Sequence, residues 1–186
     1  MEDLELIQDV QKGDQSAFEE IMRRYKNKIV NFLWQMTGDY EKAVEISQET
    51  FLRVYFKADR YRPIAPLSSW IYAIASNLAK TELKKARRNM HVSLDDVQHT
   101  ISGDIPYEEK PVNSEEVKIL KKAVQSLHPR YRIPLLLKDI EGYSQEEIAQ
   151  IMGKPIGTIK ARISRARHYV KKEMEKPSLG MALCEE

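Results

Sequence analysis

The sequence predicts an all-α protein made of two helical domains joined by an irregular acidic linker. Apolar side chains recur at intervals of three and four residues through most of the chain, and this helical periodicity stops between residues 90 and 113. Of the 186 residues, 42% are apolar and 31% are charged, which is a globular composition. With only 7 Gly and 8 Pro, a collagen-like or wholly disordered chain is excluded.

Charge is distributed unevenly along the chain, although the net charge is only +2. Residues 1–89 carry 15 basic and 13 acidic side chains, residues 90–113 carry 1 and 5, and residues 114–176 carry 14 and 8. The basic C-terminal part indicates a polyanionic partner, and the acidic stretch indicates a linker. We therefore expect domains at 1–89 and 114–176, a linker at 90–113 and a tail at 177–186.

Three helices are predicted in the first domain. The first begins at a capping box formed by Ser16 and Glu19, and the second starts after Gly38. The third follows an irregular loop at 62–66, because two prolines three residues apart cannot both lie inside a helix. The positions expected to face the core are Phe18, Met22, Tyr25, Ile29 and Leu33 in the first helix, Val44, Phe51, Val54, Tyr55 and Ala58 in the second, and Leu67, Ile71, Ile74 and Leu78 in the third.

The second domain begins with two predicted helices. The first follows Ser114, and the second starts at Pro129–Arg130, because Pro134 is tolerated only near the start of a helix. Gly142 is expected to close the second of these helices. Their apolar positions are Val117, Leu120, Val124, Leu127, Ile133, Leu136, Leu137 and Ile140.

Residues 144–172 have the pattern of a helix-turn-helix. Ser144 and Glu147 form a second capping box, Gly153 provides a left-handed residue, and Pro155 starts a new helix. Two short helices around a tight turn are the arrangement that places a recognition helix in the DNA major groove. One face of the second helix is apolar and is expected to be buried: Ile156, Ile159, Ile163, Ala166 and Val170.

The opposite face of that helix is expected to read DNA. From Lys154 to Lys172 there are seven Lys and Arg and no acidic residue, which favours neutralisation by phosphates, although a solvated basic face is the alternative. Ala161 and Ser164 are small enough for close approach to the bases, and Arg165 can then contact guanine with both arms. The candidate contacts to duplex DNA are Thr158, Lys160, Ala161, Arg162, Ser164, Arg165, Arg167 and His168.

A second candidate nucleic-acid surface follows the last helix of the first domain. An aromatic residue, an amide and several cations recur there at spacings of three and four, an arrangement that suits a single strand with a base stacked at one end. The loop from Tyr61 to Ser69 is a candidate wall for an extruded base. Core packing of Trp70 and a solvated face of lysines are the alternative explanation. The candidate contacts to single-stranded DNA are Tyr61, Ser68, Trp70, Asn77, Lys80, Lys84 and Arg88.

Five blocks of sequence are informative in combination. KGDQ begins at Lys12, AF at Ala17, SQETF at Ser47 and WIYAIASN at Trp70, and the run EGYSQEEIAQIMGKPIGTIKARISRAR ends at Arg167. Together these blocks resemble the extracytoplasmic-function (group IV) sigma factors of bacterial RNA polymerase. The resemblance extends from about residue 4 to about residue 174.

This resemblance implies an alternative sigma factor that binds core RNA polymerase and directs promoter-specific transcription initiation. It implies that 1–89 is the region-2 domain, a bundle of three to four helices, which engages the polymerase clamp and captures the opened −10 element. It implies that 114–176 is the region-4 domain, which reads the −35 element and meets the polymerase flap. Asn77 matches a family asparagine near the site of a flipped −10 base, and the linker would thread toward the RNA exit path.

The resemblance also implies the partners. Gln48, Glu49 and Phe51 fall in the clamp-facing block, where Phe51 is equally explained as a core residue. Glu45 and Ser47 depart from the usual residues of that block. Core RNA polymerase, promoter DNA and a cognate anti-sigma factor are expected to bind, with no membrane insertion and no small-molecule substrate.

Catalysis and cofactor binding are not expected. The four histidines lie far apart, and the single cysteine, Cys184, permits neither an internal disulfide nor a cysteine-based zinc site, so no metal is expected. The acidic N-terminus and the lack of an apolar run of about 20 residues favour a cytoplasmic protein. Two other classes remain as alternatives: a stand-alone helix-turn-helix regulator, which would bind duplex DNA alone as a symmetric dimer, and a helical protein-interaction adaptor.

Overall fold

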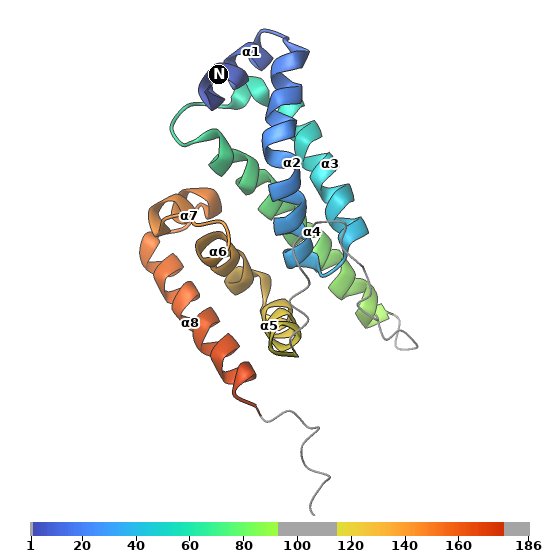
Figure 1. Ribbon diagram of the computed structural model, residues 1–186, viewed down its shortest axis with the longest axis vertical. Helices are drawn as coiled ribbons and strands as arrows, with labels where there is room; N and C mark the ends of the chain where they lie inside the picture. The colour runs from blue at the N-terminus through green and yellow to red at the C-terminus, as the bar shows by residue number, and fades with distance from the viewer. Residues whose placement is uncertain (1, 93–114, 177–186) are drawn as a thin grey trace, which may run out of the picture.

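The computed structural model describes residues 2–92 and 115–176, and the regular elements in those ranges are all helical, so the all-α prediction is confirmed. The predicted tail and most of the predicted linker, with Ser114 and Cys184, lie outside the described residues. In chain order the elements are α1 (Asp3–Gln11), α2 (Gln15–Thr37), α3 (Tyr40–Phe56), the 3-10 helix η1 (Ala58–Arg60), α4 (Leu67–Val92), α5 (Glu115–Ser126), α6 (Pro129–Asp139), α7 (Gln145–Met152) and α8 (Ile156–Met174) (Figure 1).

Local capping sets the boundaries of α2 and α3. The carboxylate of Asp14 accepts hydrogen bonds from two following backbone amides, at 2.8 and 3.3 Å, and so begins α2. The predicted capping box of Ser16 and Glu19 is therefore wrong, because Ser16 already lies inside the helix and its hydroxyl donates to Asp14 at 2.7 Å. Gly38 ends α2 in the left-handed conformation, with φ 78°, and Asp39 caps α3, as expected.

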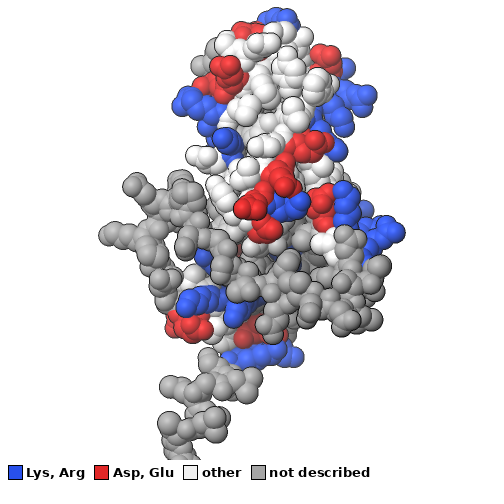
Figure 2. Space-filling view, turned by 90° about the vertical axis from the view of Figure 1, so that its right-hand side faces the viewer, with Lys and Arg blue, Asp and Glu red and all other residues white. Residues whose placement is uncertain are grey.

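The first bundle consists of α1 to α4. α2 packs against α1, α3 and α4, and α3 lies on the outer side that Figure 2 faces. α1 was not predicted, yet Leu6, Ile7 and Val10 are buried from it at helical spacing. α4 continues to Val92, beyond the predicted domain boundary at residue 89. Ala58, expected on the second helix, lies in η1 and is buried there.

The second bundle consists of α5 to α8 and contains the predicted helix-turn-helix. The capping box of Ser144 and Glu147 is present, and Gly153 ends α7 with φ 59°. α6 begins at Pro129, as predicted, but Pro134 is the sixth of its 11 residues and lies in the middle of the helix, where it cannot donate a hydrogen bond to the Arg130 carbonyl. Ile156 was expected to be buried but is 36% exposed, because side chains lean toward the N-terminus of a helix and this residue opens α8.

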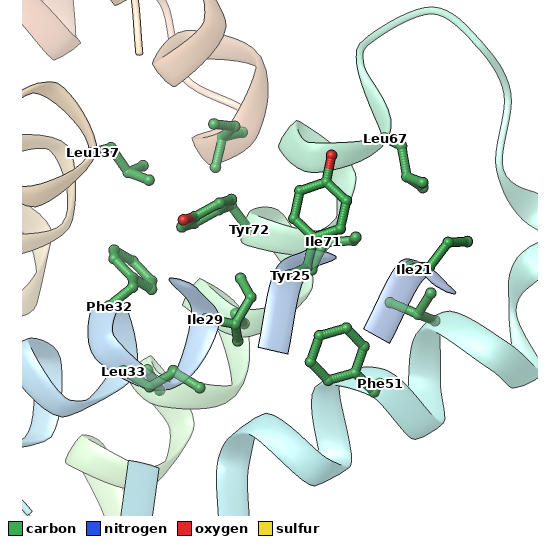
Figure 3. Packing of buried hydrophobic residues seen from close by; sticks show 14 of the residues in the cluster. Ile21, Tyr25, Ile29, Phe32, Leu33, Phe51, Leu67, Ile71, Tyr72 and Leu137 are labelled. Atoms are coloured by element: carbon green, nitrogen blue, oxygen red, sulfur yellow. The ribbon is translucent and has the colours of Figure 1, made fainter. Parts of the chain in front are cut away.

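The two bundles share one hydrophobic core, which the sequence did not predict. Figure 3 shows Phe32 of α2, Tyr72 of α4 and Leu137 of α6 next to one another, and all three belong to the same buried cluster. The Tyr72 ring meets Phe32 at a centroid distance of 5.2 Å and Tyr143 at 5.3 Å, both edge to face. The second bundle is therefore packed against α2 and α4 rather than only tethered to them.

Polar contacts accompany this apolar packing. The Tyr72 hydroxyl donates a hydrogen bond to the Glu141 carboxylate, which lies just after α6. The guanidinium of Arg132, buried at 6% exposure, donates to the Met36 carbonyl in the last turn of α2 and to the Leu127 carbonyl at 2.9 Å. These bonds satisfy groups that would otherwise be buried without partners, so they specify how the bundles dock.

The docked arrangement should depend on pH through Glu141. Burial raises the pKa of this carboxyl above its ordinary value, while the Tyr72 hydrogen bond and the nearby Lys28 act in the opposite direction. Below the ordinary pKa both the folded and the unfolded chain are protonated at this residue. As the pH rises through the raised pKa, the buried charge costs the folded state stability.

We expect Glu141→Gln, which stays neutral and can still accept from Tyr72, to gain stability relative to wild type as the pH rises from about 5 to about 8. Denaturant titrations at both pH values measure the difference in free energy of unfolding. Glu146→Gln, which changes an exposed carboxyl on α7, is the matched control and should show no such trend. An equal difference at both pH values for Glu141→Gln would contradict the prediction.

Candidate nucleic-acid interface

The outward face of α8 carries the predicted duplex-binding residues. Ile159 and Ile163, at 0% and 2% exposure, hold the inner face of this helix in the core. Because this inner face is buried, the opposite face of α8 is exposed to solvent, as a recognition helix requires. Of the candidate residues on α8, the exposed ones are Lys160, Ala161, Ser164, Arg165, Arg167 and His168, and the half-buried ones are Thr158 and Arg162.

Arg165 lies between two hollows on the surface of the second bundle. One, of about 410 Å³, is also lined by Arg130, Tyr131, Gly157, Thr158, Ala161 and Arg162. The other, of about 420 Å³, is also lined by Tyr131 and by residues of α5 and the distal part of α8. Small residues at Gly157 and Ala161 leave the first hollow open next to the Arg165 guanidinium, so an incoming base edge can reach it.

Arg167 is held differently from Arg165. Its Nε donates to one oxygen of Asp139 at 3.1 Å, and an Nη donates to the other oxygen, which makes a two-armed ion pair between α8 and the end of α6. This contact raises the pKa of Arg167 above its ordinary value and fixes the plane of the guanidinium. The pair engages two of the five N–H donors and leaves the others for the expected phosphate contact.

The loop before α4 is shaped by two aromatic side chains. Tyr61 is only 6% exposed, its hydroxyl donates to the Ala65 carbonyl at 2.8 Å, and its ring lies 5.4 Å from that of Trp70. Tyr61 and Trp70 therefore brace the loop from inside. Ile64 is 87% exposed at the outer side of the same loop, and the sequence analysis did not single it out. The two prolines predicted an irregular loop here, but only the fold shows which side chain points outward.

The candidate single-strand contacts along α4, from Ser68 to Arg88, form the α4 stripe. This stripe is partly covered by the second bundle. Asn77, Lys84 and Arg88 are exposed, whereas Ser68, Trp70 and Lys80 are half-buried. Burial lowers the pKa of Lys80, and the cations Arg162 and Lys154 lower it further. Basic residues of the two candidate DNA-binding surfaces therefore approach one another across the bundle interface.

A third exposed surface lies on α3. Gln48 and Glu49 are exposed, as expected of the clamp-facing block, but Phe51 is 3% exposed and belongs to the core. Phe51 therefore has a structural role in the core and does not belong to the exposed surface. Leu52 and Phe56, at 53% and 78% exposure, take its place on the outer face. Figure 2 shows acidic side chains gathered in the middle of this side of the molecule and an uncharged area above them.

Comparison with known proteins identifies the family. Residues 21–89 match Sigma-70 region 2, and residues 118–168 match Sigma-70 region 4. The chain is 32% identical to the ECF RNA polymerase sigma factor SigW of Bacillus subtilis over 177 residues, which cover 90% of this chain and 94% of that protein. The chain belongs to the extracytoplasmic-function sigma factor family. It is an alternative sigma factor, and it directs transcription initiation by RNA polymerase.

Other relatives give the same result. The chain is 31% identical to the RNA polymerase sigma-H factor of Pseudomonas aeruginosa, over 94% of both chains. It is 33% identical to the ECF RNA polymerase sigma-E factor of Escherichia coli K12, over 91% of this chain and 93% of the relative. A stand-alone helix-turn-helix regulator would account for the second domain alone, whereas these matches include the first. None of the helices in the described ranges combines the length and apolar character needed to cross a membrane.

Two solved structures share the fold. One is the sigma factor RpoE in complex with the anti-sigma factor NepR from Bartonella quintana, with a TM-score of 0.68, 24% identity, and coverage of 87% of this chain and 98% of that chain. The other is CnrH in complex with the cytosolic domain of CnrY, with a TM-score of 0.70, 20% identity, and coverage of 93% and 97%. The two-bundle arrangement is therefore shared with these proteins.

Replacing Arg165 with Ala should cost about 1–3 kcal/mol of binding free energy at a single base pair of the −35 element. The loss should be confined to that position, because one guanidinium reaches one base pair. Binding of the sigma factor–polymerase complex to promoters with each −35 base pair substituted measures it. Lys171→Ala, which removes a cation further along α8, is the control and should weaken binding without changing base preference. Equal losses on matched and mismatched promoters for Arg165→Ala would contradict base reading.

Proposed function

We propose that the two bundles divide promoter recognition between them. In this proposal the unit at 114–176 reads the duplex −35 element, and the unit at 1–89 captures the opened −10 element and binds the polymerase clamp. The linker at 90–113 connects the two along the RNA exit path. The observation that carries the proposal is the recognition helix. Between Thr158 and His168 the outer face of α8 presents cations and small residues with no acidic residue, on a well-packed helix-turn-helix.

The geometry of α8 supports the proposed −35 contacts. Its inner face is buried, and its outer face alternates small side chains with long basic ones. The small side chains permit close approach to the floor of the major groove, while the basic ones neutralise the flanking phosphates. This alternation of small and long basic side chains supports base reading by Arg165 and phosphate contact by Lys160 and Arg167.

The −10 contacts are proposed for the loop at 62–66 and the exposed part of the α4 stripe. Tyr61 and Trp70 hold the loop in one shape, which supports a preformed pocket for an unstacked base. Asn77 is exposed on α4, ten residues after the start of the helix and so about 15 Å along it. Its Oδ1 accepts from Lys80 at 3.3 Å, so its amide N–H₂ stays available to a base edge. Lys84 and Arg88 continue the stripe for the strand's phosphates.

The polymerase contact is proposed for the outer face of α3. Leu52 and Phe56 form an exposed apolar pair beside Gln48 and Glu49, and the Phe56 ring meets the Tyr55 ring at 5.5 Å. Exposed aromatic anchors rimmed by polar residues are characteristic of protein interfaces. The region-4 unit is proposed to meet the polymerase flap.

The packing of the bundles bears on how the chain is used. Ser68 and Lys80 of the single-strand surface are half-buried where the second bundle approaches, and Tyr143 contacts Ser68 there. We propose that the bundles separate on the polymerase, which requires the shared core to open. A cognate anti-sigma factor that stabilises a packed arrangement is proposed as a further partner, since RpoE and CnrH share this fold and are bound by NepR and CnrY. We also propose that the protein works in the cytoplasm, where its polymerase is, without catalysis of its own.

The test is transcription with purified core RNA polymerase and mapping of the RNA 5′ ends. Adding the chain should direct initiation to sites that share a −35 and a −10 element, and the chain should co-elute with the polymerase.

Asn77→Ala should reduce promoter opening, detected by permanganate reactivity of the −10 region, while −35 protection is retained. Initiation that does not depend on the chain would refute the proposal, and unchanged opening by Asn77→Ala would refute the pocket assignment.

Replacing Phe56 with Ser should weaken binding to core RNA polymerase by about tenfold, because an exposed aromatic anchor is lost. The folded structure should be retained, since this side chain is 78% exposed. Titration of labelled sigma factor with core polymerase gives the affinity. Met174→Ser, which changes a 42% exposed apolar residue at the end of α8, is the matched control and should bind normally. Unchanged affinity of the Phe56 variant would place the polymerase contact elsewhere.

A further inference from the structure

Tyr131 is anchored where α5, α6 and α8 meet. Its ring packs against the small cluster of Leu127, Leu135 and Ala166, which are 5%, 6% and 0% exposed. The Arg130 guanidinium carbon also lies 4.6 Å from the ring centroid, a cation–π contact. Because the ring packs on a buried cluster and is contacted by a guanidinium, it has little freedom to turn, and this restricts the position of its hydroxyl.

This anchored ring lies beside Arg165. Tyr131 and Arg165 both line each of the two hollows, so together they form the wall that separates them. The pKa of Tyr131 lies below its ordinary value, chiefly through hydrogen bonding with the neighbouring Arg165, and Arg130 acts in the same direction through its charge and a smaller hydrogen-bond contribution. A phenolic oxygen that accepts one bond keeps its own O–H, and a guanidinium that donates one bond keeps four N–H groups.

We propose that Tyr131 is a positioning residue for −35 recognition: it holds the Arg165 guanidinium in place for its base pair and thereby sets the discrimination at that pair. The proposal rests on the proposed role of Arg165 in base reading. Ordering a long, exposed arginine on DNA costs conformational entropy, and a side chain already held near its bound position loses less of it. Two parallel N–H bonds to a guanine also require a fixed plane, which a flexible arginine lacks.

The neighbouring Tyr169 offers a matched control. It also borders the second hollow together with Arg165, but its hydroxyl lies 3.3 Å from that of Ser126 and accepts a hydrogen bond from it. Tyr131→Phe and Tyr169→Phe each remove one hydroxyl and keep the ring. Tyr131→Phe therefore preserves the packing on Leu127 and Ala166 while removing the hydroxyl that contacts Arg165 and, to a smaller extent, Arg130.

The experiment uses the sigma factor bound to core RNA polymerase and a library of promoters with a randomised −35 element, with transcript counts as the readout. Wild type and Arg165→Ala first identify the base pair at which Arg165 acts. Tyr131→Phe should lower the preference at that pair by about two- to tenfold and leave the preferences at the other −35 positions unchanged. Tyr169→Phe should behave as wild type. In the Arg165→Ala background, Tyr131→Phe should have no further effect at that pair.

The other outcomes would each overturn a definite statement. If Arg165→Ala leaves every base preference intact, base reading by Arg165 in the proposed function fails. If Arg165→Ala abolishes one preference and Tyr131→Phe does not reduce it, or strengthens it, the positioning role alone fails. Equal loss at all −35 positions, or a loss by Tyr131→Phe that persists without Arg165, would show that the hydroxyl acts on the fold or on phosphates and not on this arginine.

Discussion

The packing of Tyr72 between the two bundles is the contact on which the arrangement of the other surfaces depends. Its ring is 2% exposed and meets side chains from α2 in the first bundle and from the turn before α7 in the second. Burying a tyrosine stabilises the docked state only if its hydroxyl finds a partner, which Glu141 supplies. Apolar area, together with the hydrogen bonds that Tyr72 and Arg132 make between the bundles, thus holds the two units together.

This docking has an electrostatic cost. It brings Lys80 of α4 into the field of Lys154 and Arg162, which lie at and beyond the turn of the helix-turn-helix. The like charges oppose the apolar packing, so the packed state is held by its core and not by its surface charges. A polyanion would relieve the repulsion wherever it reaches these cations, because phosphates replace like-charge neighbours with opposite charge.

The arginines of α8 differ in the side chains that they contact and in their burial. Arg167 is paired with a carboxylate, which both orients it and offsets its charge. Arg165 contacts a neutral phenol, which orients it and leaves the full positive charge available. Arg162 is half-buried toward α4. Side chains that look equivalent in a basic stretch therefore differ in the donors and the charge that they can offer to DNA.

Local patterns in the sequence determined most of the secondary structure. The capping box at Ser144, the left-handed turn at Gly153 and the exposed basic face of α8 rest on residues within a few positions of one another, so periodicity and capping predict them. The capping box at Ser16 failed because Asp14, two residues earlier, begins the helix instead and accepts from the Ser16 amide, which the Glu19 side chain would have had to bind. Long blocks of family sequence, which span nearly the whole chain, were enough to indicate a sigma factor.

The tertiary structure alone decided which parts of the outer faces are covered. Helical spacing placed Phe51 in the core, as the structure confirms, but it could not tell that Lys80 of α4 is half-buried, because this depends on how the second bundle docks on α4. The shared core and the contact of Tyr131 with Arg165 join residues that are far apart in the chain. Such pairs leave no periodic trace in the sequence, since they arise only when separate helices pack.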